Sequence, residues 1–200
     1  YGEEQGDDFR GGDVRWVIDP IDGTSSYVHG QPYFSVSIGI ELRGETVAGV
    51  VYAPVLEEIF VATLGGGSTC NGRPIQVSRR DKLISSMLSS GFACVRAGMK
   101  HNNIPYFTAL MPQLRDLRRY GSAAIDLSYV ACGRLEGFWE LGLHLYDVCA
   151  GMLLVREAGG RVSDFSGSEA GMVGELFASN GRIHDATVEV LKSVKALQQL

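Results

Sequence analysis

Two aspartates three positions apart are the first residues in this chain that could do chemistry. They lie in the segment Trp16-Val-Ile-Asp-Pro-Ile-Asp-Gly-Thr24, after a short apolar run that we expect to be a strand from Arg15 to Ile18. Pro20 should end regular pairing and fix the backbone, and Gly23 lets the chain approach a ligand closely. Carboxylate oxygens and exposed backbone amides bind a hard cation and a phosphate. An ordinary type I turn is the alternative interpretation of the same residues.

A third carboxylate, Asp147, opens a predicted helix over residues 147–158, where the helix dipole favours an acidic side chain. Two bridged metal ions need clustered carboxylates from separate segments of a chain, and Glu3, Asp19, Asp22 and Asp147 supply them. Asp147 could alternatively act only as the N-cap of its helix. The sequence has no P-loop, Rossmann glycine motif, EF-hand, zinc-ligand spacing or serine-hydrolase motif, so it supports none of these rival functions.

The composition excludes several classes of protein. The chain has 200 residues, 45% of them hydrophobic and 20% charged, which is typical of a globular fold and not of a disordered chain. Its 18 basic and 23 acidic residues give a net charge of -5, so we expect no nucleic-acid or membrane partner. Apolar runs such as residues 151–155 are far shorter than the roughly 20 residues of a membrane span. We therefore expect a soluble, cytoplasmic protein.

Hydrophobic periodicity predicts an antiparallel meander in the first eighty residues. Between positions 34 and 42, apolar residues alternate with small or polar ones, which is typical of a strand with two different faces. Returning strands are expected at 46–53 and 58–63, and Asn71-Gly72 predicts a tight turn.

The second half changes to a helical period. We expect helices at 122–132, 147–158 and 184–199, with strands at 161–165 and 177–179. These elements predict a layered α/β (α+β) architecture. We divide it into a metal-binding antiparallel sheet subdomain, residues 1–78, and a C-terminal α/β subdomain, residues 79–200, which together form one unit.

Two stretches resemble the signatures of the inositol monophosphatase family. Asp19-Pro-Ile-Asp-Gly-Thr24, with Phe34-Ser-Val-Ser-Ile-Gly39 downstream, is similar to the first signature. Trp139-Glu-Leu-Gly-Leu-His-Leu-Tyr-Asp147, followed by Glu157-Ala-Gly-Gly160, is similar to the second, and Gly2-Glu-Glu4 to an acidic element upstream. The resemblance covers essentially the whole chain. It implies an α/β/α/β sandwich of the inositol monophosphatase or sugar phosphatase type, and a Mg²⁺-dependent, lithium-sensitive phosphomonoesterase that forms a homodimer.

The same resemblance implies roles for residues at matching positions, with two or three Mg²⁺ ions per site. The implied metal ligands are Glu3, Asp19, the carbonyl of Ile21, Asp22 and Asp147. The implied catalytic residues are Glu3, Asp22 and Thr24, the last of which would orient the attacking water. The implied substrate and phosphate contacts are Gly23, Thr24, Ser122, Ala123 and Glu140, where Glu140 would accept a substrate hydroxyl. A surface position on a strand is the alternative for Glu140.

The chain departs from the family pattern in three respects. Ser25-Ser26-Tyr27 follows Thr24 where the family has an asparagine and a phenylalanine, and Tyr146 replaces a tryptophan before Asp147. The family also has a long segment before the Gly-Glu-Glu element, with an aspartate that pairs with the threonine. We expect the chain to be part of a longer protein, and the alternative is a short form that binds metal and phosphate with little turnover.

The expected activity is hydrolysis of a small polyol phosphate, inositol 1-phosphate first. Alternative substrates on the same site are fructose 1,6-bisphosphate, histidinol phosphate and a 3′-nucleotide. A catalytically weak, metal- and phosphate-binding homodimer is the alternative from another functional class.

Overall fold

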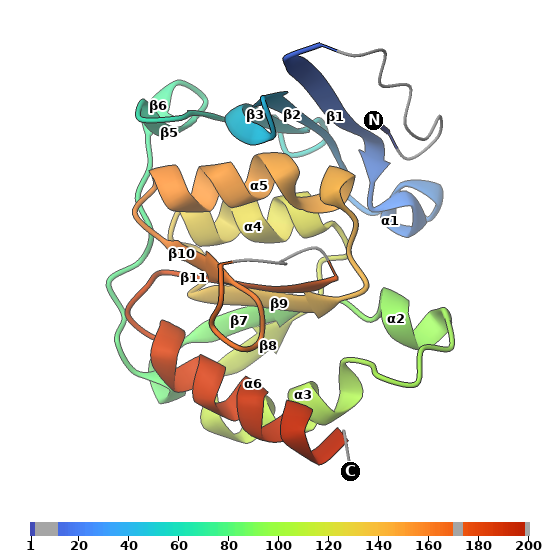
Figure 1. Ribbon diagram of the computed structural model, residues 1–200, viewed down its shortest axis with the longest axis vertical. Coiled ribbons are helices and arrows are strands. Elements are labelled where there is room, and N and C mark those ends of the chain that lie inside the picture. The colour runs from blue at the N-terminus through green and yellow to red at the C-terminus, as the bar shows by residue number, and fades with distance from the viewer. Residues whose placement is uncertain (3–11, 170–173, 199–200) are drawn as a thin grey trace.

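The computed structural model describes residues 1–2, 12–169 and 174–198 of the chain. Residues 14–74 form an antiparallel sheet whose strands lie side by side in chain order (Figure 1). The strands are β1 Val14–Asp22, β2 Ser35–Leu42, β3 Glu45–Ala53, β4 Glu58–Thr63, β5 Gly67–Cys70 and β6 Arg73–Pro74. This arrangement confirms the predicted meander.

Two tight turns connect strands of this sheet, and one of them lies at the predicted Asn71-Gly72 pair. At Asn71-Gly72 both residues have positive φ, 49° and 73°, which a two-residue type I′ hairpin requires. The turn between β2 and β3 uses Arg43 and Gly44 in the same way, with φ of 54° and 84°. Asparagine and glycine tolerate this conformation well, so the Asn-Gly pair sets the register of β5 against β6.

The small, polar face of β2 is the buried one. Ser35, Ser37 and Gly39 are buried, whereas the apolar side chains that alternate with them are only half-buried. Helix α5, Leu145–Glu157, lies across this face of the sheet and comes so close that small residues are needed. A Cβ atom on Gly49 of β3 would be 2.9 Å from the Cα atom of Ala150. The alternation was therefore predictable, but the choice of buried face depends on how closely α5 packs.

A second, mixed sheet forms from the rest of the chain, with strand order β10-β11-β9-β7-β8. β7 runs parallel to its neighbours β8 and β9, and β9, β11 and β10 are antiparallel. The strands are β7 Met87–Ser90, β8 Asp116–Arg118, β9 Gly137–Leu141, β10 Arg161–Ser163 and β11 Glu175–Ser179. The predicted strands at 161–165 and 177–179 are confirmed to within two residues, whereas β7 and β8 were not predicted.

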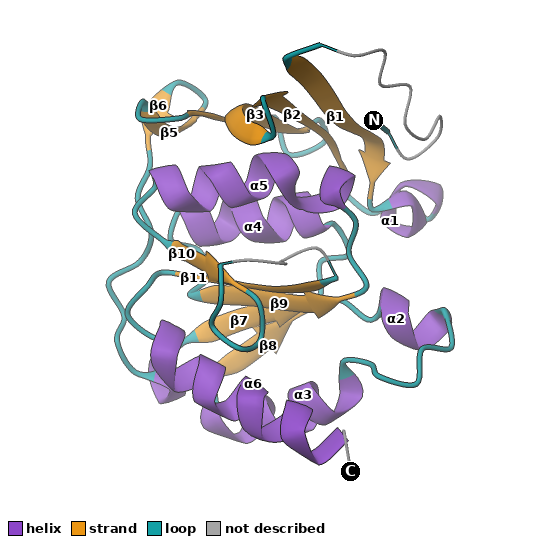
Figure 2. Ribbon diagram, viewed as in Figure 1, coloured by secondary structure: helices purple, strands orange, loops and turns teal. Residues whose placement is uncertain are grey.

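Helices α4, Ala123–Ala131, and α5 lie between the two sheets, and α3, Ile104–Leu110, and α6, His184–Gln198, cover the outer face of the second sheet (Figure 2). The predicted helices at 122–132, 147–158 and 184–199 are confirmed to within two residues at each end. Short helices α1, Thr24–Val28, and α2, Ala93–Arg96, complete the set together with 3-10 turns at 83–85 and 111–113. The layered α/β sandwich is thus confirmed. None of the helices in the described ranges is long and apolar enough to cross a membrane.

Two apolar cores lie on opposite faces of the second sheet. Strand β9 contributes to both, because Phe138 packs with α4 and α5 while Trp139 packs with α3 and α6. Alternation along a strand then places Glu140 on the same face as Phe138, toward α4. Glu140 is therefore positioned by a strand whose neighbouring side chains are anchored in both cores.

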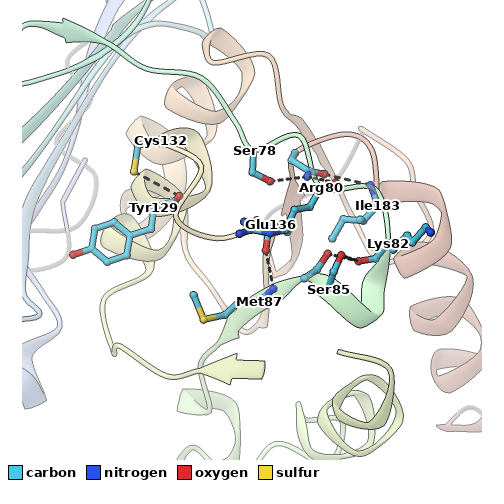
Figure 3. A network of polar contacts seen from close by, with 11 residues as sticks. Ser78, Arg80, Lys82, Ser85, Met87, Tyr129, Cys132, Glu136 and Ile183 are labelled. Atoms are coloured by element: carbon cyan, nitrogen blue, oxygen red, sulfur yellow. Dashed lines mark hydrogen bonds and ion pairs between the residues drawn. The ribbon is translucent and has the colours of Figure 1, made fainter. Parts of the chain in front are cut away.

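A network of hydrogen bonds positions the crossover, residues 75–86, which connects the two sheets (Figure 3). The buried carboxylate of Glu136 accepts hydrogen bonds from the Arg80 guanidinium at 2.9 Å and from the Met87 amide at 2.7 Å. Asn180 donates to the Ser78 hydroxyl and to the Arg80 carbonyl. The crossover thus has defined partners on the second sheet. The division into subdomains at residue 78 stays a prediction.

We expect Gly49→Ala to destabilise the protein because the added methyl group meets the backbone of α5, which cannot yield as a side chain can. Overpacking of this kind costs about 1–3 kcal/mol. Urea unfolding at equilibrium measures the effect, and Gly12→Ala, where a Cβ atom would enter open space, is the matched control. Equal midpoints for the two variants would contradict the close packing of α5 on β3.

Candidate active site

A β-bulge places the two aspartates of the first motif on one face of β1. Asp19 pairs with Ser37 and Asp22 with Ser35, so β1 carries one extra residue between the two pairs. Residues three apart would normally point to opposite faces of a strand, and the bulge brings them to the same buried face. Pro20 fits this irregular position because it has no N–H to pair. The predicted end of the strand at Ile18 is therefore wrong, and β1 continues to Asp22.

Asp22 is held by the N-terminus of α4. Its Oδ2 atom accepts hydrogen bonds from the Ser122 hydroxyl and the Ala124 amide, both at 2.7 Å, and its Oδ1 atom accepts a longer one from the Ala123 amide. The Ser122 hydroxyl accepts in turn from the Ile125 amide. Together these bonds satisfy amides that a helix N-terminus leaves without partners. Ser122 is completely buried and positions Asp22, while its predicted contact with substrate stays a prediction.

Gly23 and Thr24 form the sharp connection from β1 to α1. Gly23 has φ of 90°, and a Cβ atom there would be 2.8 Å from the carbonyl oxygen of Tyr33, so only glycine fits. The Thr24 hydroxyl donates to the carbonyl oxygen of Ile21 at 3.1 Å. The predicted water-orienting hydroxyl and the predicted carbonyl ligand are thus in contact.

Asp147 lies in the first turn of α5, which begins at Leu145 and not at Asp147 itself. Its Oδ2 atom accepts a 2.6 Å hydrogen bond from the backbone amide of His144, the residue that caps the helix. This is a capping-box contact at the third helical position. Asp147 therefore has a structural role in α5 close to the N-cap alternative, and it also lines the cleft described next.

One cleft of about 490 Å³ brings most of the predicted residues together. The predicted residues that line it are Asp22, Gly23, Thr24, Ala123, Glu140 and Asp147. Asp19, Ile21 and Ser122 are not among its lining residues, and Glu3 lies outside the described residues. A groove of about 560 Å³ at the far end of α5 contains none of the predicted residues, so we assign the site to the smaller cleft.

Glu140 is buried in the cleft wall by a close contact with Gly91. A Cβ atom on Gly91 would collide with the carboxyl group of Glu140, so this position on the loop after β7 needs glycine. The backbone amide of Ala93 donates a hydrogen bond to the same carboxyl group. The surface alternative for Glu140 is therefore wrong, because only 6% of the residue is exposed.

The charges in the cleft act on one another. Burial above all, and then the negative charges of Asp22 and Asp147, raise the pKa of Glu140 to about 8. The guanidinium group of Arg119, which also lines the cleft, opposes this shift. The cleft thus concentrates carboxyl groups that repel one another in the absence of a cation.

Asp126 is a cleft residue that the sequence analysis missed. It lies on α4 with 2% of its surface exposed, and burial, followed by the charges of Glu140 and Asp22, raises its pKa well above the usual range. An acid within a helix of otherwise apolar or small residues was a signal for it. The helix at 123–131 is buried along its whole length, so an aspartate there is not a solvated surface residue.

The donor chemistry of the cleft fits Mg²⁺, which prefers carboxylate and carbonyl oxygens. Asp22 and Asp147 line the cleft, and their negative charges repel that of Glu140. A bound cation would relieve this repulsion. Within residues 1–2, 12–169 and 174–198, however, no three acidic, histidine or cysteine side chains cluster as a metal site. The ligand set implied by the family resemblance also includes Glu3, whose structure is not described.

A sequence profile of the inositol monophosphatase family matches residues 1–196, nearly the whole chain. This chain belongs to the inositol monophosphatase family. An inositol-1-monophosphatase of Mesorhizobium japonicum is 42% identical over 179 residues, covering 89% of this chain and 67% of that protein. The Nus factor SuhB of Xylella fastidiosa is 42% identical over 187 residues, covering 90% of this chain and 68% of the relative.

The solved structure of inositol monophosphatase from Anabaena matches with a TM-score of 0.92 and 41% identity, over 96% of this chain and 77% of that one. The chain spans about two thirds of the length of the curated relatives it matches, 62% for an inositol-1-monophosphatase of Synechocystis. The family resemblance and the layered fold are both confirmed. Membership in this family indicates a phosphatase, a hydrolase of phosphate esters, and the family is generally metal-dependent.

We expect Glu140→Gln to stabilise the metal-free protein more at alkaline than at acidic pH. In the native state Glu140 keeps its proton up to about pH 8, whereas the unfolded chain releases it near 4.5. The unfolded state binds fewer protons between these values, so native stability falls as pH rises through this window, and glutamine removes that loss.

Thermal melting in EDTA, at about pH 5 and about pH 8, measures this effect. The gain in Tm of Glu140→Gln over the unsubstituted protein should be larger by a few degrees or more at the higher pH. Glu45→Gln, at an exposed site on β3, is the control. The same gain at both pH values would show that burial of Glu140 does not shift its pKa.

Proposed function

We propose that this protein hydrolyses the phosphate monoester of a small polyol, inositol 1-phosphate first, with Mg²⁺ as cofactor. The observation that supports this most is that Asp22 and Asp147, which are 125 residues apart in the sequence, line the same cleft as Thr24 and Glu140. Oxygen donors for a hard cation and a buried acceptor for a hydroxyl then border the same space. We further propose inhibition by lithium, a cytoplasmic location and a homodimer.

We propose that Asp19, Asp22, Asp147 and the carbonyl oxygen of Ile21 would hold two or three Mg²⁺ ions together with Glu3. Bound Mg²⁺ lowers the pKa of water and neutralises charge on the phosphate and on the leaving oxygen. Asp22 is suited to this role because hydrogen bonds from the start of α4 reach both of its carboxylate oxygens, with the longer bond on Oδ1, and so fix the orientation of the carboxylate. The capping contact with His144 orients Asp147 in the same manner.

The residues of the chain then place the substrate. The amides of Gly23 and Thr24 donate to the phosphate oxygens, and the Thr24 hydroxyl orients the attacking water. Its present contact with the Ile21 carbonyl keeps that hydroxyl close to a proposed ligand. Ala123 borders the substrate, and Glu140 accepts a hydrogen bond from a polyol hydroxyl. Ser122 acts indirectly, because its hydroxyl donates a hydrogen bond to Asp22 and so positions that carboxylate.

One observation favours a second candidate, hydrolysis of a bisphosphate such as fructose 1,6-bisphosphate. Arg96 and Arg119 both line the otherwise acidic cleft, and Arg96 donates to the Ser25 hydroxyl at 3.4 Å. Guanidinium groups at the cleft could pair with a second phosphate. Preference for inositol 1-phosphate over a bisphosphate distinguishes the two candidates.

The test of the proposed function is release of phosphate from inositol 1-phosphate with millimolar Mg²⁺. We expect Asp147→Asn to lower kcat/KM by at least about 10³-fold, because the amide loses the ligand charge while its oxygen still caps α5. Asp22→Asn should be equally inactive. The control is Asp185→Asn, at an exposed position of α6 that pairs with Arg161 far from the cleft.

Activity that survives Asp147→Asn with the same Mg²⁺ dependence would refute the assignment. Tight, Mg²⁺-dependent phosphate binding by the unsubstituted protein without any turnover would instead support the catalytically weak binding protein. Melting curves of each variant show whether it is folded.

Binding of Mg²⁺ itself should appear as a rise in Tm. An ion that binds the native state alone stabilises it by RT ln(1 + [Mg²⁺]/Kd), about 1.4 kcal/mol at ten times Kd. We expect this rise in the unsubstituted protein and a clear reduction of it in Asp147→Asn, with NaCl of equal ionic strength as the control. An equal rise in both proteins would place the ion elsewhere.

A further inference from the structure

One buried oxygen in the cleft has no hydrogen-bond partner among the residues that the structure describes. This is the Oδ1 atom of Asp126, a residue of α4 that is 98% buried and lines the cleft. A buried polar atom without a partner costs about 1–3 kcal/mol or more, so native proteins rarely keep one without a reason. Asp126 is one of the residues that line the cleft, so a ligand bound there could supply a donor to its carboxyl group.

The surroundings restrict the chemistry of that donor. Asp22 and Glu140 are the acidic groups whose charges act most on Asp126, and they would repel a phosphate placed against it. The proposed Mg²⁺ ligands that line the cleft are Asp22 and Asp147, and Asp126 is not one of them. A neutral O–H donor meets no charge repulsion at Asp126. The surroundings of Asp126 therefore favour the hydroxyl groups of a substrate over its phosphate.

Two buried carboxyl groups from different elements line this cleft, and the charge of Glu140 acts on Asp126. Glu140 comes from β9, and the Gly91 contact and the Ala93 amide fix its position. Asp126 comes from α4, and the Ser89 hydroxyl of β7 is the neighbouring donor that lowers its pKa, although the atoms Ser89 Oγ and Asp126 Oδ1 do not form a hydrogen bond of normal geometry. Both carboxyl groups belong to rigid elements, so together they form two preorganised acceptors. Adjacent hydroxyl groups on a polyol present two donors to such a pair.

We propose that Asp126 is a specificity-determining residue that accepts a hydrogen bond from a hydroxyl of the polyol, beside the hydroxyl that Glu140 accepts. The proposal rests on the proposed function and narrows the substrate class to phosphate esters of polyols with at least two hydroxyl groups near each other. A site with buried polar groups discriminates strongly against an analogue that leaves them unpaired. Simple alkyl phosphates should therefore be poor substrates.

The test compares two substrates, inositol 1-phosphate and ethyl phosphate, with Mg²⁺ present. The measured quantity is the ratio of their kcat/KM values, because a general loss of folded or metal-loaded enzyme cancels from it. Asp126→Ala should lower this ratio about 10-fold to 100-fold, mainly by raising KM for inositol 1-phosphate. Asp126→Asn keeps a carbonyl oxygen in the same place and should restore most of the lost ratio.

Ser128→Ala is the matched control on the same helix. Its hydroxyl is buried and donates to the Ala124 carbonyl at 2.7 Å, and it does not line the cleft. We expect its ratio to stay within about 2-fold of the unsubstituted protein. Combining Asp126→Ala with Glu140→Gln should lower the ratio by less than the product of the single effects, because both acceptors act on one polyol.

Two results would overturn the proposal. An unchanged ratio in Asp126→Ala, which includes an equal loss on both substrates, would show that the residue does not contact substrate. A ratio in Asp126→Asn as low as in Asp126→Ala would show that an acceptor oxygen is not what matters. If the unsubstituted protein hydrolyses neither substrate, the proposed function itself fails, a result distinct from the other two.

Discussion

The hydrogen bonds between Asp22 and the N-terminus of α4 join the two elements, β1 and α4, between which the cleft forms. A helix start buried between two sheets leaves amides that must find acceptors, and the carboxylate of Asp22 provides them. The same bonds fix β1 of the first sheet to a helix that packs on the second. The cleft exists at this junction because a strand end and a helix end meet there. Removing the carboxylate would therefore disturb both the joint and the chemistry.

Close packing of α5 has a similar double effect. Gly39 and Gly49 have no side chain, so α5 can lie directly on the first sheet. Gly151 in turn leaves room for α4 to pack against the other side of α5. A helix packed this closely on two sides has little freedom to rotate. Asp147, in its first turn, is consequently presented to the cleft in one orientation. These three glycines thus help to set the position of Asp147, a proposed metal ligand, because they set the position of α5.

Much of this fold could be predicted because its signals are local. The alternation in residues 34–42, the Asn71-Gly72 turn and the period of the later helices all depend on neighbouring residues, and the structure agrees with them. The bulge at Pro20 depends on pairing with β2, and the burial of Ser35 and Ser37 depends on α5, so neither could be read from local pattern. β7 and β8 were missed because strands of three or four residues carry too little pattern to detect.

The residues of the cleft divide in the same way. Asp22, Thr24 and Asp147 belong to motifs with recognisable spacing, whereas Asp126 and Gly91 become significant only through what lies across from them. Burial of Asp126 and Glu140 opposes folding, since each carboxyl group leaves water and faces other negative charges. The two apolar cores on either side of β9 offset this cost. Buried carboxyl groups in the cleft lower the stability of the unliganded protein. A binding site accepts this cost because a bound metal ion or substrate then supplies the opposite charges and hydrogen-bond donors.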